Sequence, residues 1–143
     1  MPVVCTLLVT ACLGGGRPLP PAHSVVESLV FRTSLSAFMA EVRSDRHDPR
    51  LDWSSDGCSA PVVGGTGRSF DFTDACTRHD FAYRNLSRID DGRRWSGSVR
   101  ARVDAVFRRD MNDACARRRI GDRTSCRTWA AIFHRAVRTW AGP

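Results

Sequence analysis

A histidine and an aspartate stand side by side in the middle of the chain, at His79 and Asp80. His79 falls on a stripe of apolar positions with helical spacing, so its imidazole faces the interior, where it could remove a proton from a reactant. Asp80 follows about 100° further round the same helix and therefore points elsewhere. A lone inward histidine is more often a packed core residue than a catalyst, so its chemistry depends on its neighbours.

A second acid, Asp56, lies in the polar loop before this helix and is followed by Gly57 and Cys58. If Cys58 forms a disulfide with Cys76, one turn before the histidine, Asp56 and the Gly57 backbone lie beside the turn that carries Asp80. Two carboxylates and a carbonyl are oxygen donors, which suit Ca²⁺ better than Zn²⁺ and leave positions for water and substrate. A histidine beside such an open Ca²⁺ site indicates hydrolysis.

The six cysteines fall into two groups. Cys5 and Cys12 lie near the N-terminus, and the other four are Cys58, Cys76, Cys115 and Cys126. No Cys-x-x-Cys pair is present, so the four are expected to form two disulfides in an oxidising compartment rather than a zinc site. Four cysteines allow three pairings, and their number does not select one.

Helical periodicity predicts the elements that position these residues. Ser34 is the expected N-cap of a first helix, and Thr73 or Asp74 the expected cap of the helix that carries the histidine. Apolar residues from Val99 to Ala114 and from Trp129 to Trp140 mark two more helices. No segment alternates with the period of a β-strand, so the sequence predicts an all-α domain.

The length of 143 residues allows one domain behind a processed leader. Residues 1–23 are expected to be an export signal or lipoprotein leader with a Gly/Pro-rich linker, and residues 24–143 the catalytic domain. The segment 9–12 has the shape of a lipoprotein cleavage box, which would make Cys12 an acylated first residue.

The basic residues are all arginine, and they are unevenly distributed. The chain has a formal net charge of +7, and the excess of positive charge lies after residue 76. This charge suits an anionic partner such as a membrane surface or a nucleic acid. Because the arginines are spread over several predicted helices without interleaved aromatic residues, and because export is expected, no nucleic-acid partner is predicted.

The motifs resemble those of the secreted bacterial and fungal phospholipases A2. Residues 70–85, with Cys-x-x-His-Asp at their centre, look like the catalytic helix of this family, and residues 51–58 resemble its calcium loop. Residues 102–107 and 110–115 are similar to its second long helix. The resemblance covers roughly residues 34 to 140. It implies a small disulfide-stapled fold in which two long antiparallel helices carry the active site.

The resemblance also implies a role for each site residue. His79 would be the general base, and Asp104 would accept a hydrogen bond from the other imidazole nitrogen and hold the tautomer. Ca²⁺ would be bound by the carboxylates of Asp56 and Asp80 and by the carbonyl of Gly57. The implied disulfides are Cys58–Cys76 and Cys115–Cys126.

Two positions stay open when only the residues are considered. The periodicity of the second long helix allows either Asp104 or Asp110 to reach the histidine, and only the resemblance selects Asp104. Asp110 is then an inward acid that we expect to pair with an arginine or to be hydrogen-bonded internally. Tyr83, four residues after His79, suits simple packing as well as a hydrogen bond to the aspartate.

The predicted function is Ca²⁺-dependent hydrolysis of the sn-2 ester of glycerophospholipids, which releases a fatty acid and a lysophospholipid. The substrate would lie in a phospholipid membrane or micelle, and the protein is expected to be a secreted monomer, with a lipid anchor on Cys12 as an open alternative. The competing interpretation is a non-catalytic, disulfide-stapled protein of the same fold that binds membranes or a receptor.

Overall fold

The computed structural model describes residues 18–57 and 70–140, and within these ranges it is helical without a β-strand. Its elements are α1 (Ala22–Glu27), the π-helical turn η1 (Ser28–Arg32), α2 (Leu35–Val42), α3 (Thr73–Leu86), the 3₁₀ turn η2 (Ile89–Gly92), α4 (Gly97–Ala116) and α5 (Ile120–Trp140). The prediction of an all-α domain is confirmed.

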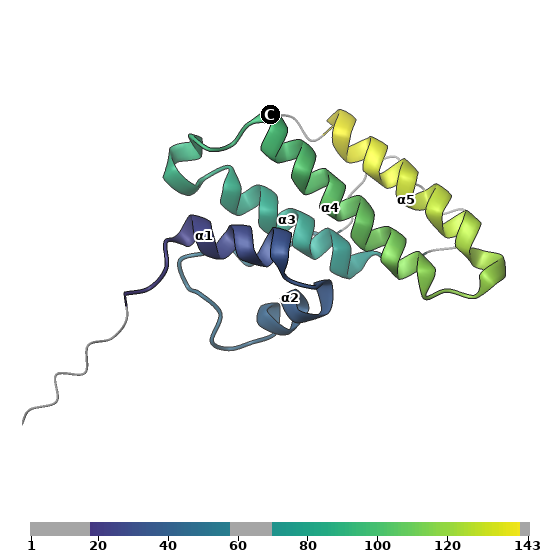
Figure 1. Ribbon diagram of the computed structural model, residues 1–143, viewed down its shortest axis with the longest axis horizontal. Helices are drawn as coiled ribbons and strands as arrows, with labels where there is room; N and C mark the ends of the chain where they lie inside the picture. The colour runs from purple at the N-terminus through teal and green to yellow at the C-terminus, as the bar shows by residue number, and fades with distance from the viewer. Residues whose placement is uncertain (1–17, 58–69, 141–143) are drawn as a thin grey trace, which may run out of the picture.

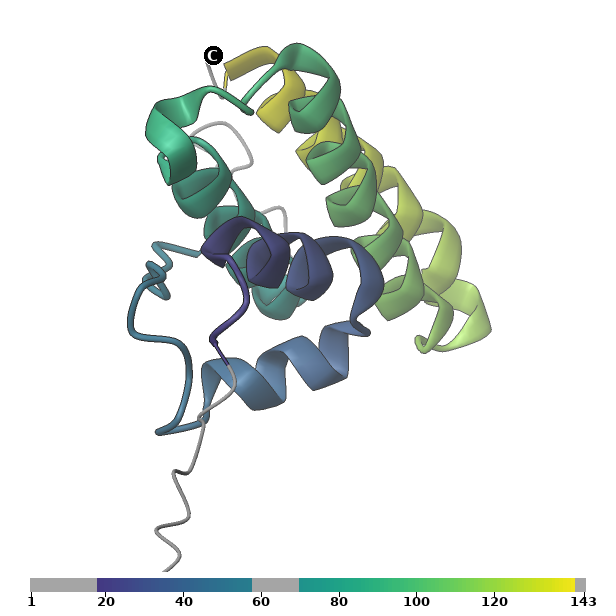
Figure 2. The same cartoon turned by 60° about the vertical axis from the view of Figure 1, so that its left-hand side comes forward.

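The three C-terminal helices form the frame of the molecule, with α4 packed between α3 and α5 (Figure 1). Consecutive helices in this frame run antiparallel, since the chain reverses direction between α3 and α4 and again between α4 and α5. The N-terminal helices α1 and α2 both pack against α3 (Figure 2). The antiparallel pair α3 and α4 therefore lies at the centre of the fold, as the resemblance implied.

Side-chain caps set the starts of two helices. The hydroxyl of Ser34 accepts a hydrogen bond from the Ala37 amide at 3.2 Å, as the sequence predicts, and Ser96 caps α4 in the same way. The prediction for α3 is wrong, because this helix already begins at Thr73. Its first amide instead donates to Oδ1 of Asp71, at 3.0 Å.

The apolar stripes miss the helical segment at the N-terminus and predict too short a last helix. The predicted helices start at Leu35, whereas the structure begins with α1, which continues directly into η1. The last helix starts at Ile120 rather than near Trp129. Its first turns are mostly polar, so the apolar pattern does not reveal them.

Two hydrophobic clusters fill the interior, one on each side of the centre of α3. The first joins the N-terminal helices to α3 and α4, and its buried members are Val26, Val30, Phe38, Met39, Leu51, Phe81, Ala82, Leu86 and Val103. The second joins α3, α4 and α5 through Phe72, Ala75, Cys76, Phe107, Met111, Cys115, Cys126 and Ala130. None of the described helices combines the length and apolar character needed to cross a bilayer.

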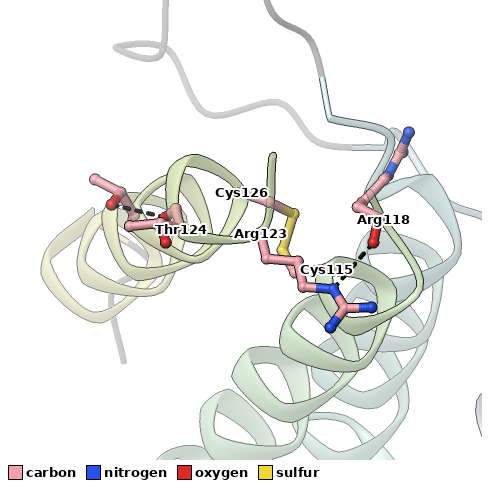
Figure 3. Close-up of a disulfide and its surroundings, with 6 residues drawn as sticks. Cys115, Arg118, Arg123, Thr124 and Cys126 are labelled. Atoms are coloured by element: carbon pink, nitrogen blue, oxygen red, sulfur yellow. Dashed lines mark hydrogen bonds between the residues drawn. A yellow bond between two sulfur atoms is a disulfide. The ribbon is translucent and has the colours of Figure 1, made fainter. Parts of the chain in front are cut away.

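A disulfide between Cys115 and Cys126 joins the last turn of α4 to α5 across the short connection between them (Figure 3). Their Cα atoms are 5.5 Å apart, and Arg123 Nε donates to the Arg118 carbonyl at 3.0 Å beside the bridge. This predicted pairing is confirmed. Cys58, the partner expected for Cys76, lies outside the described residues, as does most of the predicted leader with Cys12.

Candidate active site

His79 on α3 and Asp104 on α4 form a buried pair. The Nε2 atom of His79 lies 3.0 Å from Oδ1 of Asp104, and the two residues are only 8% and 0% exposed. The imidazole lies between the rings of Tyr83 and Phe107, at centroid distances of 4.5 and 4.6 Å. Because water is largely excluded here, the interaction between the two groups is stronger than it would be at the surface.

The carboxylate of Asp104 accepts two further hydrogen bonds. The hydroxyl of Tyr83 donates to Oδ1 at 2.9 Å, and Nη1 of Arg138 donates to Oδ2 at 3.2 Å. Burial raises the pKa of Asp104, but its three hydrogen bonds outweigh burial and hold the pKa below the ordinary value. An ionised carboxylate only accepts hydrogen bonds, so Nε2 of His79 is the donor, and in the neutral imidazole the lone pair therefore lies on Nδ1.

Tyr83 is a hydrogen-bond donor to this pair, which decides a point that the sequence leaves open. Burial, together with the negative charge of Asp104, raises the pKa of Tyr83 to about 12, so its hydroxyl stays protonated. Nε of Arg100 donates to the same hydroxyl at 3.0 Å. Since a guanidinium has no acceptor, the oxygen of Tyr83 accepts from Arg100 and its single hydrogen points to Asp104.

Asp110 has a partner of its own and does not take part in the pair. It forms a buried salt bridge with Arg78, whose Nε lies 2.9 Å from Oδ2 of Asp110. Both side chains are 2% exposed. The prediction that Asp110 pairs with an arginine is confirmed, and of the two acids that the periodicity allows, Asp104 reaches the histidine.

The predicted calcium ligands also come together. Oδ2 of Asp80 accepts hydrogen bonds from the hydroxyl of Ser55 at 2.6 Å and from the amide of Asp56 at 3.2 Å. The amide of Gly57 in turn donates to Oγ of Ser55 at 3.1 Å. Gly57 has a φ of +75°, in the left-handed region that favours glycine. These contacts place Asp56 and Gly57 directly beside the turn that carries Asp80.

The charges at this loop suit a cation. Burial raises the pKa of Asp80, and the neighbouring Asp56 raises it further, against the opposing hydrogen bond from Ser55. Nη2 of Arg84 lies 3.0 Å from Oδ1 of Asp56 and supplies one positive charge. A hard cation between two carboxylates relieves their repulsion, so the donors fit Ca²⁺.

Side chains alone do not complete a metal site here. Among residues 18–57 and 70–140, no group of three or more His, Cys, Asp or Glu side chains could hold a metal ion. The remaining ligands of a cation at Asp56 and Asp80 would therefore be backbone carbonyls, water or substrate oxygens.

The sequence of the chain matches known proteins over most of its length. The family model described as prokaryotic phospholipase A2 matches residues 26–141. The chain belongs to this family. It is 34% identical to a secretory phospholipase A2 of Arthroderma benhamiae over 118 residues, which are 80% of this chain and 76% of that protein. It is also 33% identical to a secretory phospholipase A2 of Beauveria bassiana over 125 residues, which are 87% of this chain and 62% of that protein.

One residue of this phospholipase A2 domain that is absent from the sequence predictions holds the loop that leads to Asp56 and Gly57. Asn85 on α3 is 3% exposed. Its Oδ1 accepts from the amide of Asp52 at 2.9 Å, and its Nδ2 donates to the carbonyl of Asp52 at 2.8 Å and to that of Phe81 at 2.9 Å. Asn85 thus fixes the loop backbone four residues before Asp56.

Two arginines of the domain are also absent from the sequence predictions: Arg138 donates to Asp104, and Arg100 donates to Tyr83. Arg100 stands four residues before Asp104, and this helical spacing is a signal that could have identified it. Arg138 lies 34 residues beyond Asp104, on another helix. No local pattern connects them, since their contact depends on how α5 packs against α4.

Proposed function

We propose that this chain hydrolyses the sn-2 ester of glycerophospholipids in a Ca²⁺-dependent reaction, releasing a fatty acid and a lysophospholipid. The observation that carries the proposal is the buried His79–Asp104 pair, in which Nε2 of the histidine lies 3.0 Å from Oδ1 of the aspartate. The family supports the reaction class, because the two fungal relatives are both described as secretory phospholipases A2.

In the first step, Nδ1 of His79 takes a proton from water as the water oxygen bonds to the carbonyl carbon of the ester. The ionised carboxylate of Asp104 stabilises the imidazolium that forms and keeps the ring oriented. In the second step the bond between this carbon and the glycerol oxygen breaks. The proton then passes from His79 to the leaving alkoxide of the lysophospholipid, which restores the neutral imidazole.

The carboxylates of Asp56 and Asp80 and the carbonyl of Gly57 would hold the cation. Bound there, Ca²⁺ would supply positive charge for the lipid phosphate and for the oxyanion of the ester. Asn85 holds the loop backbone at Asp52, and Ser55 in the loop donates to the carboxylate of Asp80 on α3. We propose a membrane or micelle surface as the site of action, and a secreted monomer as the acting form; the lipid anchor on Cys12 stays a prediction from the sequence.

The test is the release of fatty acid from vesicles of a phospholipid with different acyl chains at sn-1 and sn-2. We expect release of the sn-2 chain with Ca²⁺, and release roughly a hundredfold slower with EGTA, because a metal ion contributes several kcal/mol to such a reaction. Asp80→Asn should need much more Ca²⁺ than wild type, whereas Asp113→Asn, at an exposed position of α4, should not. Release that is unaffected by EGTA, or release of the sn-1 chain, contradicts the proposal.

A further inference from the structure

The last turn of α5 reaches the catalytic pair. Nη1 of Arg138 donates to Oδ2 of Asp104 at 3.2 Å. In the other direction, Nη2 of Arg100 on α4 donates to the carbonyls of Val137 and Arg138, at 3.1 and 3.0 Å. Two arginines thus connect the end of α5 with the residue that orients the histidine.

These contacts restrain the carboxylate of Asp104 on both oxygens. Oδ1 accepts from His79 and from Tyr83, and Oδ2 accepts from Arg138. Because a hydrogen bond constrains direction as well as distance, a carboxylate held on both oxygens cannot turn about its Cβ–Cγ bond without losing a charge-assisted hydrogen bond. The orientation of the imidazole depends on that of the carboxylate.

Arg100 fixes the rest of the arrangement. Its Nε sets the direction of the Tyr83 hydroxyl, and its Nη2 binds carbonyls in the last turn of α5. Carbonyls in the last turn of a helix lack intrahelical partners, and a cation is favoured there by the helix dipole. Arg100 therefore stabilises the position from which Arg138 contacts Asp104.

We propose that Arg138, held in place through Arg100, is a positioning residue of the catalytic pair, so that the active site is complete only when the end of α5 is docked on α4. This inference rests on the proposed hydrolysis by His79. Arg138 acts through Asp104 and does not contact the reacting atoms. The side chain of Arg138 is 44% exposed, so its replacement leaves no buried cavity.

The experiment compares Arg138→Met with Arg135→Met in the full chain. Arg135 is exposed, lies one turn earlier on α5 and makes no side-chain hydrogen bond within the described residues, so its variant has the same loss of charge toward the lipid surface. With vesicles and saturating Ca²⁺, we expect kcat to fall about tenfold in Arg138→Met, which is the lower end for a hydrogen bond to a charged group. KM and the Ca²⁺ dissociation constant should match those of Arg135→Met, and Arg138→Lys should recover part of kcat because it keeps the cation.

Two further readouts separate positioning from a merely structural role. In an Asp104→Asn background, Arg138→Met should lower kcat no further, because the partner through which it acts is already lost. In NMR spectra, the Nε2 proton of His79 should exchange faster with water in Arg138→Met than in Arg135→Met. If Arg138→Met does not fold, Arg138→Gln keeps a polar side chain at this half-exposed position and should lose kcat to the same extent.

The inference is overturned if folded Arg138→Met or Arg138→Gln has the kcat of Arg135→Met, or if Arg138→Met lowers kcat just as much in the Asp104→Asn background. This failure differs from failure of the proposed function. If only the inference about Arg138 fails, wild type still releases fatty acid and His79→Ala does not. If the proposed function fails, wild type releases none or His79→Ala retains the activity.

Discussion

At the scale of single residues, the direction of one proton defines the His79–Asp104 pair. Asp104 is ionised and accepts on both oxygens, so Nε2 of His79 carries a hydrogen, and in the neutral imidazole the lone pair on Nδ1 is the proposed base. Tyr83 contributes to this state, because its hydroxyl hydrogen points to Asp104.

Replacing Tyr83 with phenylalanine tests this contribution. We expect Tyr83→Phe to lower kcat by roughly threefold to tenfold and the free energy of unfolding by about 1 kcal/mol, because it removes one hydrogen bond to Asp104 and leaves Nε of Arg100 without its acceptor. Vesicle hydrolysis and urea unfolding measure the two effects. An unchanged kcat would show that the hydroxyl only fills space beside the imidazole.

The residues of the site differ in how far the sequence predicts them. His79 can be identified because it lies on an apolar helical stripe. Asp80 directly follows it, and Asp56 lies in a polar loop two residues before Cys58. The choice between Asp104 and Asp110 cannot be made from periodicity, since both are buried on the same helix. The structure makes the choice, because Asp110 is paired with the buried Arg78. This contact forms only when α3 and α4 pack together, so the sequence pattern does not reveal it.

At the scale of elements, α3 has two roles, since it carries His79 on one face and on another clamps the loop that we propose binds Ca²⁺. The clamp is Asn85, whose amide uses both ends on the backbone of Asp52. Such an amide can hold a loop in the conformation that binds a cation, which reduces the cost of ordering the loop on binding.

Replacing Asn85 with alanine should therefore weaken calcium binding. We expect the Ca²⁺ dissociation constant of Asn85→Ala to rise about tenfold, because two hydrogen bonds to the loop backbone are lost. Isothermal titration of the protein with Ca²⁺ in the absence of lipid measures this directly. Asn112→Ala, a partly exposed asparagine on α4, is the control and should bind Ca²⁺ like wild type. Equal dissociation constants for the two variants would argue against the clamp.

The elements themselves follow the sequence where caps and apolar stripes are strong. Ser34 begins α2 as predicted, because its hydroxyl accepts the amide of Ala37. The first turns of α5 are polar except at Ile120, which is exposed, and at Cys126, which is buried and bonded to Cys115, so periodicity misses them. The start of a helix that is held by a tertiary contact is not encoded in its local pattern.

At the scale of the whole molecule, one buried ion pair joins three parts of the fold. Arg78 on α3 binds Asp110 on α4, and its Nη1 also donates to the carbonyl of Thr33 at 2.7 Å, just after η1. The N-terminal helices are thus joined to α3 one residue before His79. Both charged groups are almost fully buried, so each depends on the other for its solvation.

Breaking this pair should destabilise the fold. We expect Asp110→Asn to lower the free energy of unfolding by about 3 kcal/mol, because the guanidinium of Arg78 stays buried without its counter-charge. The double variant Arg78→Met/Asp110→Leu should lose much less, since no unpaired charge remains. Urea unfolding compares both with Asp113→Asn, an exposed acid on the same helix. If Asp110→Asn is as stable as Asp113→Asn, the ion pair does not hold the molecule together.

The structure shows where the excess positive charge of the chain lies. The arginine-rich part begins at Arg78 and comprises α3, α4 and α5, the helices that carry and surround the catalytic pair. Some of these arginines serve the fold or the site, as Arg78, Arg100 and Arg138 do. The exposed ones add positive charge around a site whose proposed substrate is a phosphate ester.

The central claim is that His79 is the base that activates water. The most direct measurement is kcat for release of the sn-2 fatty acid by His79→Ala, compared with wild type and with His23→Ala, a histidine variant on α1. General-base catalysis contributes about 10²- to 10⁴-fold, so kcat of His79→Ala should fall by about a thousandfold while the fold and kcat of His23→Ala stay unchanged. If folded His79→Ala retains the wild-type kcat, the catalytic role assigned to the buried pair is wrong.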